Sequence, residues 1–303
     1  MRKVLVLGAS GFIGQNLIKY LQPNFETSAI SLRNENWKSK VDSFDVFINL
    51  VGKAHDHNGT ATEKDYYYAN LDLTKEIFNQ FLTSDATLLI HISSLAALEE
   101  FESVRPLIES DNANPQSFYG KSKRDAEEWL LKQTLPANKK LIILRPPMVH
   151  GVGDKGNLSL LYKLISKGIP YPLSSFDNRR SFISICNFAF FIQEIIRKQH
   201  LLESGIYHIA DDETISTSQI IEIIKKVENI NILNLSIPQS IVKRFAKIGD
   251  ILPLPLNTKR LKKMTCNLEI SNQKIKKVLE IKELPLTAEG GLEVTIRGFV
   301  KTK

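Results

Sequence analysis

Three glycines at a spacing of three residues, directly after a short apolar run, constrain the fold of this chain more than any other feature. Residues 4–7 are all apolar, as is typical of a strand buried on both faces of a parallel sheet. The order of strand, glycine turn and amphipathic helix is the context of a dinucleotide site, with phosphates at the helix N-terminus. We therefore expect an α/β fold built on a Rossmann-type doubly wound parallel sheet. The residues expected to contact the dinucleotide here are Gly8, Ser10, Gly11, Phe12, Ile13 and Gly14.

The end of the second expected strand, residues 27–32, bears on the choice of dinucleotide. In NAD-binding folds an acid after this strand usually grips the ribose hydroxyls. Here Arg33 and Asn34 follow instead. An arginine suits the 2′-phosphate of NADP(H), so NADP(H) is favoured as the cofactor and NAD(H) is the alternative. The plainer interpretation is an arginine that faces solvent on a loop.

The third expected strand, residues 44–51, begins so soon after the second that a strand of the usual fold is expected to be missing or stunted. Val51 and Gly52 close this strand with small side chains, past which a flat nicotinamide-ribose could lie. We expect both residues in the cofactor site. His55 and His57 follow, but no third ligand is in view, so we predict no metal site.

A tyrosine and a lysine four residues apart, Tyr119 and Lys123, are the best candidates for proton chemistry. Of the eight tyrosines, only Tyr119 has a lysine four residues on. In a helix the two side chains share a face, and an ammonium beside a phenol favours the phenolate. We therefore expect the pKa of Tyr119 to fall toward neutrality, where it can exchange a proton with an alcohol or ketone. The alternative is a surface pair on an amphipathic helix.

Polar residues on two neighbouring elements are placed to serve the same site. Ser93 and Ser94 end the apolar strand 87–92, and ligands of open α/β sheets bind at the carboxyl ends of the strands. Asn70 lies within a long helical stretch, residues 63–82, where we expect its amide to hold a neighbouring loop.

Composition and charge limit which partners and which cellular location we expect. The net charge is +7, and much of the excess lies in the last third of the chain. Solvated helix faces are the favoured interpretation, although a basic surface would also attract a diphosphate or an anionic membrane. Nucleic acid is not expected, because no recognition motif accompanies the charge. Two isolated cysteines, no leader-like start and no apolar run of about 18 residues favour a cytoplasmic protein without a membrane span.

The order of elements predicts two parts. Residues 1–155 and 181–210 are expected to form the dinucleotide-binding domain, which includes strands at 140–145 and 205–210. Residues 156–180 and 211–303 are expected to form a smaller, mainly helical lobe that binds substrate.

Taken together, the motifs resemble the extended short-chain dehydrogenase/reductase family, in its nucleotide-sugar epimerase/dehydratase branch. The motifs are residues 8–14, 93–94, 119–123, 145–147 and 180–182, and the likeness covers nearly the whole chain. The resemblance implies catalytic roles for Ser94, Tyr119 and Lys123. It also places Pro146 near the nicotinamide, Arg180 on the diphosphate of a nucleotide sugar, and Asn157 on the substrate.

Within this branch the sequence favours one of three reactions at C4 of the sugar. The 4,6-dehydratases of the family carry Asp-Glu after the catalytic Ser or Thr, where this chain has Leu95 and Ala96, so dehydration is set aside. Arg33 favours an NADPH-linked 4-reductase of a UDP-4-keto-6-deoxy-HexNAc, in surface-polysaccharide precursor synthesis. The alternative is a UDP-hexose or UDP-HexNAc 4-epimerase that retains NAD. A dinucleotide-sensing regulator is the more distant alternative, and a homodimer is compatible with any of these.

Overall fold

The structure, a computed structural model, describes residues 1–34, 36–54, 60–232, 235–252 and 257–301. The predicted loop with His55 and His57 lies outside these residues. The strands are β1 (Lys3–Leu7), β2 (Glu26–Ile30), β3 (Val46–Asn49), β4 (Leu88–Ile92), β5 (Lys140–Arg145), β6 (Met148–His150), β7 (Phe182–Ser184) and β8 (Gly205–His208). The helices are α1 (Phe12–Leu21), α2 (Glu63–Tyr67), α3 (Leu73–Thr83), α4 (Phe118–Leu131), α5 (Asn157–Ile165), α6 (Ile185–Arg197), α7 (Thr217–Glu228), α8 (Gln239–Gly249), α9 (Thr258–Thr265), α10 (Gln273–Val278) and α11 (Ala288–Val300).

Six parallel strands form the main sheet, in the order β2-β1-β3-β4-β5-β8. β1 lies between β2 and β3, and Leu7 is level with Ile30 on one side and Asn49 on the other. The carboxyl ends of these strands therefore meet at one edge. Between β2 and β3 the described residues hold only a short 3₁₀ helix, Trp37–Lys40, so β2 is the edge strand. The expected missing strand is thus confirmed for the described part of the chain.

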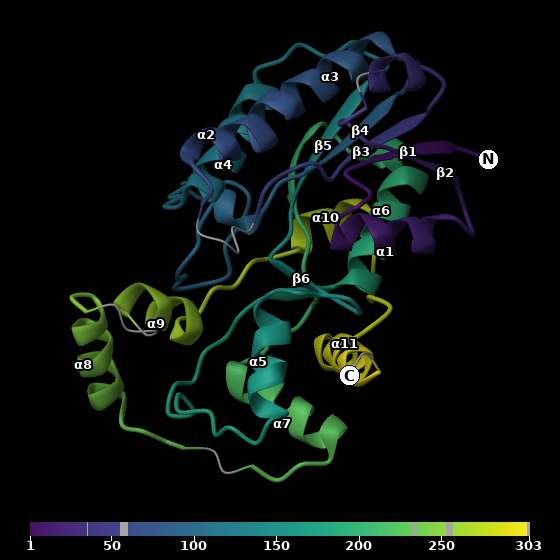
Figure 1. Ribbon diagram of the computed structural model, residues 1–303. Coiled ribbons are helices and arrows are strands. Elements are labelled where there is room, and N and C mark those ends of the chain that lie inside the picture. Colours follow the sequence, from purple (N-terminus) through teal and green to yellow (C-terminus); the bar gives the residue numbers. More distant parts are fainter. Residues whose placement is uncertain (35, 55–59, 233–234, 253–256, 302–303) are drawn as a thin grey trace.

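Alternate residues of each strand enter two different cores, one on each face of the sheet. One core takes Val4, Val6, Val46 and Ile48 and is covered by α1 and α6. The other takes Leu5, Leu7 and Phe47 from the same strands and is covered by α3 and α4. Figure 1 shows these helices on the two sides of the sheet. Because side chains alternate along a strand, a sheet buried on both faces needs apolar residues at every position. The predicted doubly wound fold is confirmed.

Two local features differ from the predictions. The helical stretch expected at 63–82 is interrupted by a π-helical turn, Tyr68–Asp72, between α2 and α3. The structure also has a short strand that was not predicted, β6, which pairs in parallel with β7 in a second, two-stranded sheet. Three-residue strands carry too little periodicity to be recognised from sequence.

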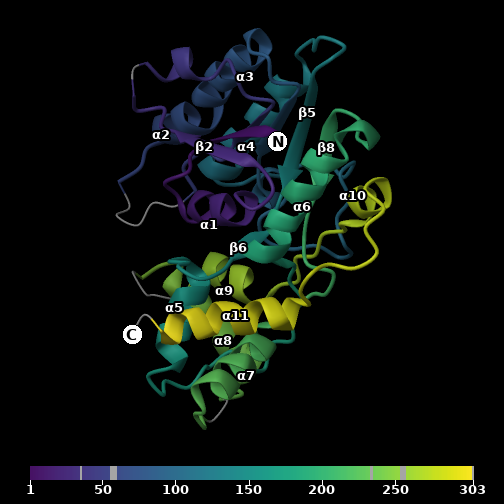
Figure 2. The same cartoon turned by 90° about the vertical axis from the view of Figure 1, so that its right-hand side faces the viewer.

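Helices beyond the main sheet form a separate lobe core. Residues of α5, α7 and α11 pack there, and Figure 2 shows α11 lying across this lobe. The predicted domain boundary at residue 211 stays a prediction. Ile275 and Leu279 lie after this boundary in sequence, yet they pack in the core of the main sheet. No helix in the described ranges is both long enough and apolar enough to span a membrane.

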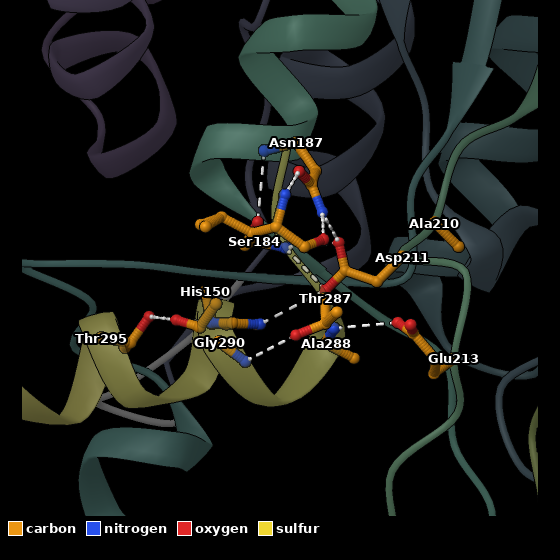
Figure 3. Close-up of polar contacts among 12 residues, drawn as sticks. His150, Ser184, Asn187, Ala210, Asp211, Glu213, Thr287, Ala288, Gly290 and Thr295 are labelled. Atoms are coloured by element: carbon orange, nitrogen blue, oxygen red, sulfur yellow. Dashed lines mark hydrogen bonds and ion pairs between the residues drawn. The ribbon is translucent and has the colours of Figure 1, made fainter. Parts of the chain in front are cut away.

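Buried polar contacts fasten the lobe to the sheet (Figure 3). Both carboxylate oxygens of Asp211 accept from the backbone N–H of Ser184 at 3.2 Å, and Asn187 Nδ2 donates to the same carboxylate at 2.7 Å. His150 at the end of β6 is hydrogen-bonded through Nδ1 to Thr295 of α11 at 2.9 Å. Because these groups are buried, each contact avoids a desolvation penalty, and together the contacts join α11 and the segment after β8 to β6, β7 and α6.

Candidate active site

The glycine turn after β1 contains two kinds of glycine. Gly8 has φ +85°, and an added Cβ there would lie 2.8 Å from the backbone of Leu50 and Val51. At Gly14 an added Cβ would lie 2.5 Å from Ala9 Cα, so protein packing alone requires both glycines. At Gly11, by contrast, an added Cβ would meet only Gly8 O, at 3.6 Å. Gly11 is the N-cap residue of α1, and its open side leaves space beside the helix N-terminus.

Arg33 lies in an exposed turn just after β2, at the same sheet edge as the glycine turn. The Arg33 N–H donates to Ser31 Oγ at 3.3 Å, and the Asn34 N–H donates to Ser31 O at 3.1 Å. These bonds shape the turn and leave the guanidinium exposed. Residues 31–34 contain no acid, and Glu35, which follows them in sequence, lies outside the described residues.

The loop after β3 lies against the helix that carries the tyrosine and lysine. An added Cβ at Gly52 would lie 2.6 Å from Asn70 Oδ1 and 3.1 Å from Lys123 Nζ. Asn70 sits in the π-helical turn, accepts from the Lys53 N–H at 2.9 Å and donates to Ser122 Oγ at 2.9 Å. The amide thus joins the loop to α4, as the sequence predicted, and the structure brings Gly52 beside Lys123.

α4 presents Tyr119 and Lys123 one turn apart, and Ser117 caps the helix by accepting from the Gly120 N–H at 3.0 Å. Lys123 is 4% exposed and donates to the carbonyl oxygen of Ile92, at the end of β4, at 2.9 Å. Burial lowers the pKa of Lys123 to about 8, against the opposing effect of the Glu127 carboxylate.

The pKa of Tyr119 corrects the sequence prediction. Burial raises this pKa above its ordinary value, the Glu100 carboxylate adds to the rise, and a hydrogen bond with Ser94 opposes it. The expected depression by Lys123 was wrong for this structure, because the effect of burial on the phenol dominates. Tyr119 is therefore a neutral phenol at neutral pH, which can donate a proton.

Ser94 and Pro146 are neighbours through the backbone. The 3₁₀ turn that begins after Ser94 places the Leu95 N–H 2.8 Å from Pro146 O, to which it donates. Ser94 Oγ accepts from the Ala96 N–H at 3.1 Å. The ends of β4 and β5 thus bring Ser94, Tyr119, Lys123 and Pro146 into one region at the carboxyl edge of the sheet.

A buried ion pair beneath this region was missed from the sequence. Arg145 grips Glu127 with two hydrogen bonds, Nε to Oε1 at 2.9 Å and Nη2 to Oε2 at 2.6 Å. Ser93 Oγ also donates to Glu127 Oε1, at 2.6 Å. The pair joins α4 to the ends of β4 and β5. The available signal was Glu127 itself, an acid four residues after Lys123 and therefore on the same helix face.

The two predicted substrate residues lie in a different setting. Arg180 is half-buried, and its guanidinium donates to Cys266 O at 3.2 Å. Burial lowers the pKa of Arg180, and in the described ranges no carboxylate pairs with it. Asn157 is exposed as the first residue of α5. Among the residues described, neither side chain hydrogen-bonds to Ser94, Tyr119 or Lys123.

Comparison with known proteins assigns the family. The model of the NAD-dependent epimerase/dehydratase family matches residues 4–210, which hold the glycine turn, Ser94, Tyr119 and Lys123. The chain belongs to this family. It is therefore an enzyme of the extended short-chain dehydrogenase/reductase type, and the predicted resemblance is confirmed.

Relatives in this family match along the whole chain. A UDP-glucose 4-epimerase of Vibrio cholerae is 25% identical over 99% of this chain and 96% of its own. The N-acetyl-alpha-D-glucosaminyl-diphospho-ditrans,octacis-undecaprenol 4-epimerase of Escherichia coli O157:H7 is 23% identical over the same shares. The structure of a UDP-glucose 4-epimerase from Thermotoga maritima with UDP-glucose covers 99% of each chain, with a TM-score of 0.78 and 16% identity, and supports the fold.

Proposed function

We propose that this enzyme transfers hydride at C4 of a nucleotide-activated sugar, as an NADPH-linked 4-reductase of a UDP-4-keto-6-deoxy-HexNAc. NADP(H) is the proposed cofactor within this NAD-dependent family. The open side of Gly11 at the N-terminus of α1 fits a dinucleotide phosphate, and the exposed Arg33 fits a 2′-phosphate. When bound, the cofactor supplies the hydride that C4 accepts.

The residues of the chain would handle the proton. Tyr119, a neutral phenol because burial raises its pKa, donates its proton to the oxygen at C4 as that oxygen gains negative charge. Ser94, which shares a hydrogen bond with Tyr119, holds the same oxygen. Lys123 lies beside Gly52, where its ammonium can bind the nicotinamide ribose.

The observation that carries the choice of a reductase is the turn after β2. A carboxylate is lacking at residues 31–34, and Arg33 is exposed at the sheet edge that holds the glycine turn. Leu95 and Ala96 after Ser94 offer no acid or base for elimination, so dehydration finds no support.

The experiment mixes the purified enzyme with a UDP-4-keto-6-deoxy-HexNAc and NADPH and follows the loss of absorbance at the reduced nicotinamide. Arg33→Ala should weaken NADPH binding by about 1–3 kcal/mol and leave NADH binding nearly unchanged, because only the 2′-phosphate contact is lost. Arg297→Ala removes an exposed arginine of α11 and serves as the control. Equal losses for both dinucleotides would remove the case for NADPH.

A 4-epimerase is the second candidate, favoured by the relatives that match along the whole chain. An epimerase reuses its cofactor within each turnover, so it gains by holding NAD tightly, whereas a reductase must release oxidised cofactor. Tightly bound NAD in the purified protein, with interconversion of UDP-hexoses and no net oxidation of NADPH, would decide for the epimerase.

A further inference from the structure

Helix α8 exposes an apolar stripe. Ile241, Phe245 and Ile248 recur at spacings of four and three residues, so they share one side of the helix, and Leu252 follows three residues after its end. All four are exposed, and Phe245 is 60% exposed. The buried positions of α8 form an adjacent stripe, Val242, Ala246 and Gly249, two of which pack in the lobe core. One apolar stripe of α8 is therefore covered by the protein, and the adjacent one is exposed.

The open stripe is bordered by positive charge. Lys243, Arg244 and Lys247 are exposed on the side of the stripe away from the buried positions. In the described part of the chain none of the three makes an ion pair. Residues 239–265 contain seven lysines and arginines against a single acid, Asp250. The net charge of this segment is thus nearly that of the entire protein.

The lysines of α9 are exposed too, but they contact residues of the loop that precedes α4. Lys262 pairs with Glu102, and Lys259 and Lys263 lie over the ring of Phe101 at 5.7 and 5.2 Å from its centroid. α9 therefore fastens α8 to the loop that precedes α4. A cavity of about 540 Å³ lies at this junction, lined by residues that include Gln116 and Thr258. Figure 1 shows α8 as the outermost helix on this side, with α9 between it and the body of the protein.

We propose that α8 docks on the surface of an anionic phospholipid bilayer. An exposed apolar stripe beside a basic flank is the pattern of helices that lie in the membrane interface, with the apolar side chains among the acyl chains and the cations at the phosphates. A second copy of this chain fits less well, because pairing would bring together two segments that each carry seven basic residues against one acid. The contact is peripheral and holds for either reaction proposed above.

The first experiment measures sedimentation of the full-length enzyme with vesicles. Vesicles of phosphatidylethanolamine with about one third phosphatidylglycerol present the anionic surface, and pure phosphatidylcholine vesicles present a neutral one. We expect binding to the anionic vesicles, weaker binding at high salt, and little binding to phosphatidylcholine. Enzyme that stays in the supernatant with anionic vesicles at low salt overturns the proposal.

Matched variants separate the two parts of the surface. Ile241→Ser/Phe245→Ser should weaken binding at least tenfold, because the apolar insertion is lost. Lys243→Gln/Arg244→Gln/Lys247→Gln should weaken it by on the order of a hundredfold, at roughly fivefold for each cation. Leu160→Ser, at an exposed leucine of α5, is the apolar control. The charge control removes three exposed lysines elsewhere, Lys132, Lys167 and Lys282.

Thermal unfolding and turnover without lipid check that each variant folds. If the α8 variants bind vesicles as the wild type does, or the controls lose as much binding as the α8 variants, the proposal fails.

Insertion is tested separately with Phe245→Trp. The new indole should shift its emission to the blue with anionic vesicles and be quenched by brominated acyl chains, over the constant background of Trp37 and Trp129. Binding without either change would mean electrostatic attraction alone and would overturn docking through the stripe. A dimer in ultracentrifugation that Ile241→Ser/Phe245→Ser dissociates, with no vesicle binding, would assign α8 to a contact between copies.

Discussion

The sheet edge and the lobe hold their predicted functional residues in different ways. At the sheet edge, Lys123 is buried and bonded to the end of β4, and Glu127 beneath it is gripped by Arg145 and Ser93. In the lobe, the Arg180 guanidinium donates to the carbonyl oxygen of Cys266, and Asn157 is exposed. The first group is fixed by the core before any ligand binds, whereas the second has hydrogen-bonding capacity left for one.

This difference implies a division of labour. Side chains preorganised in a low-dielectric setting are suited to chemistry, because they need no rearrangement when charge develops. Side chains with hydrogen-bonding groups that the protein does not use are suited to binding, because the ligand can use those groups. Substitutions at the sheet edge should therefore affect turnover or stability, and substitutions in the lobe should affect substrate affinity.

Tyr119→Phe should give the largest effect. Without the phenol proton, turnover should fall by on the order of a hundredfold to ten-thousandfold, while dinucleotide binding stays near normal. Tyr67→Phe is the matched control, since Tyr67 donates to Asp125 of α4 at 2.8 Å and is also a phenol next to that helix. Steady-state kinetics with cofactor titration measures both. Turnover of Tyr119→Phe within a few fold of wild type would remove Tyr119 from the chemistry.

Glu127→Gln tests the buried network. Loss of the carboxylate leaves the Arg145 guanidinium buried without its counter-charge, which should cost about 3–5 kcal/mol of stability. Glu128→Gln breaks a pair with Arg124 in which the glutamate is 45% exposed, and should cost well under 1 kcal/mol. Urea unfolding of the three proteins gives the difference. Equal midpoints for the two variants would show that the network does not hold α4 in place.

Burial of Lys123 should appear in the pH dependence of stability. The pKa of Lys123 is lowered to about 8 from 10.5, so between these pH values the unfolded chain keeps a proton that the folded one has lost. Stability should therefore rise with pH across this window, by on the order of 3 kcal/mol at most. Lys123→Met should lack this component. The free energy of unfolding is measured at several pH values for both proteins. If it changes with pH between 8 and 10.5 in the same way for wild type and variant, the burial of a titrating lysine is contradicted.

The sequence was most informative where backbone geometry demands a particular residue. Gly8 and Gly14 are required by contacts of an added Cβ with backbone atoms, and such positions leave a pattern in sequence. The two-sided burial of the sheet likewise shows as uninterrupted apolar runs, such as residues 4–7. The fold class, the positions of the main strands along the chain and the family could therefore be predicted.

The remaining features depend on contacts between residues far apart in sequence. The sequence does not distinguish Glu127 from the other acids, because its partner Arg145 lies on a different element, β5. No local pattern predicts that pair. The pKa of Tyr119 was mispredicted because spacing on a helix gives proximity but not burial, which here dominates. The short strands β6 and β7 pair only because the lobe folds back.

Arg180→Ala should give the smallest effect and the sharpest test of the comparison. The Arg180 side chain is half-buried, and no carboxylate in the described ranges pairs with it. Its positive charge and its N–H groups are therefore available to bind a diphosphate. We expect the variant to bind UDP and UDP-sugar more weakly by roughly 1–3 kcal/mol, with dinucleotide affinity and turnover at saturation nearly unchanged.

Arg180→Lys should recover part of the loss, because a lysine keeps the charge but not the fork. Arg179→Ala, at the exposed neighbour, is the control. Calorimetry with UDP measures the affinity directly. If affinity is unchanged, Arg180 does not bind the diphosphate, and if turnover falls as far as in Tyr119→Phe, the division between sheet edge and lobe is wrong.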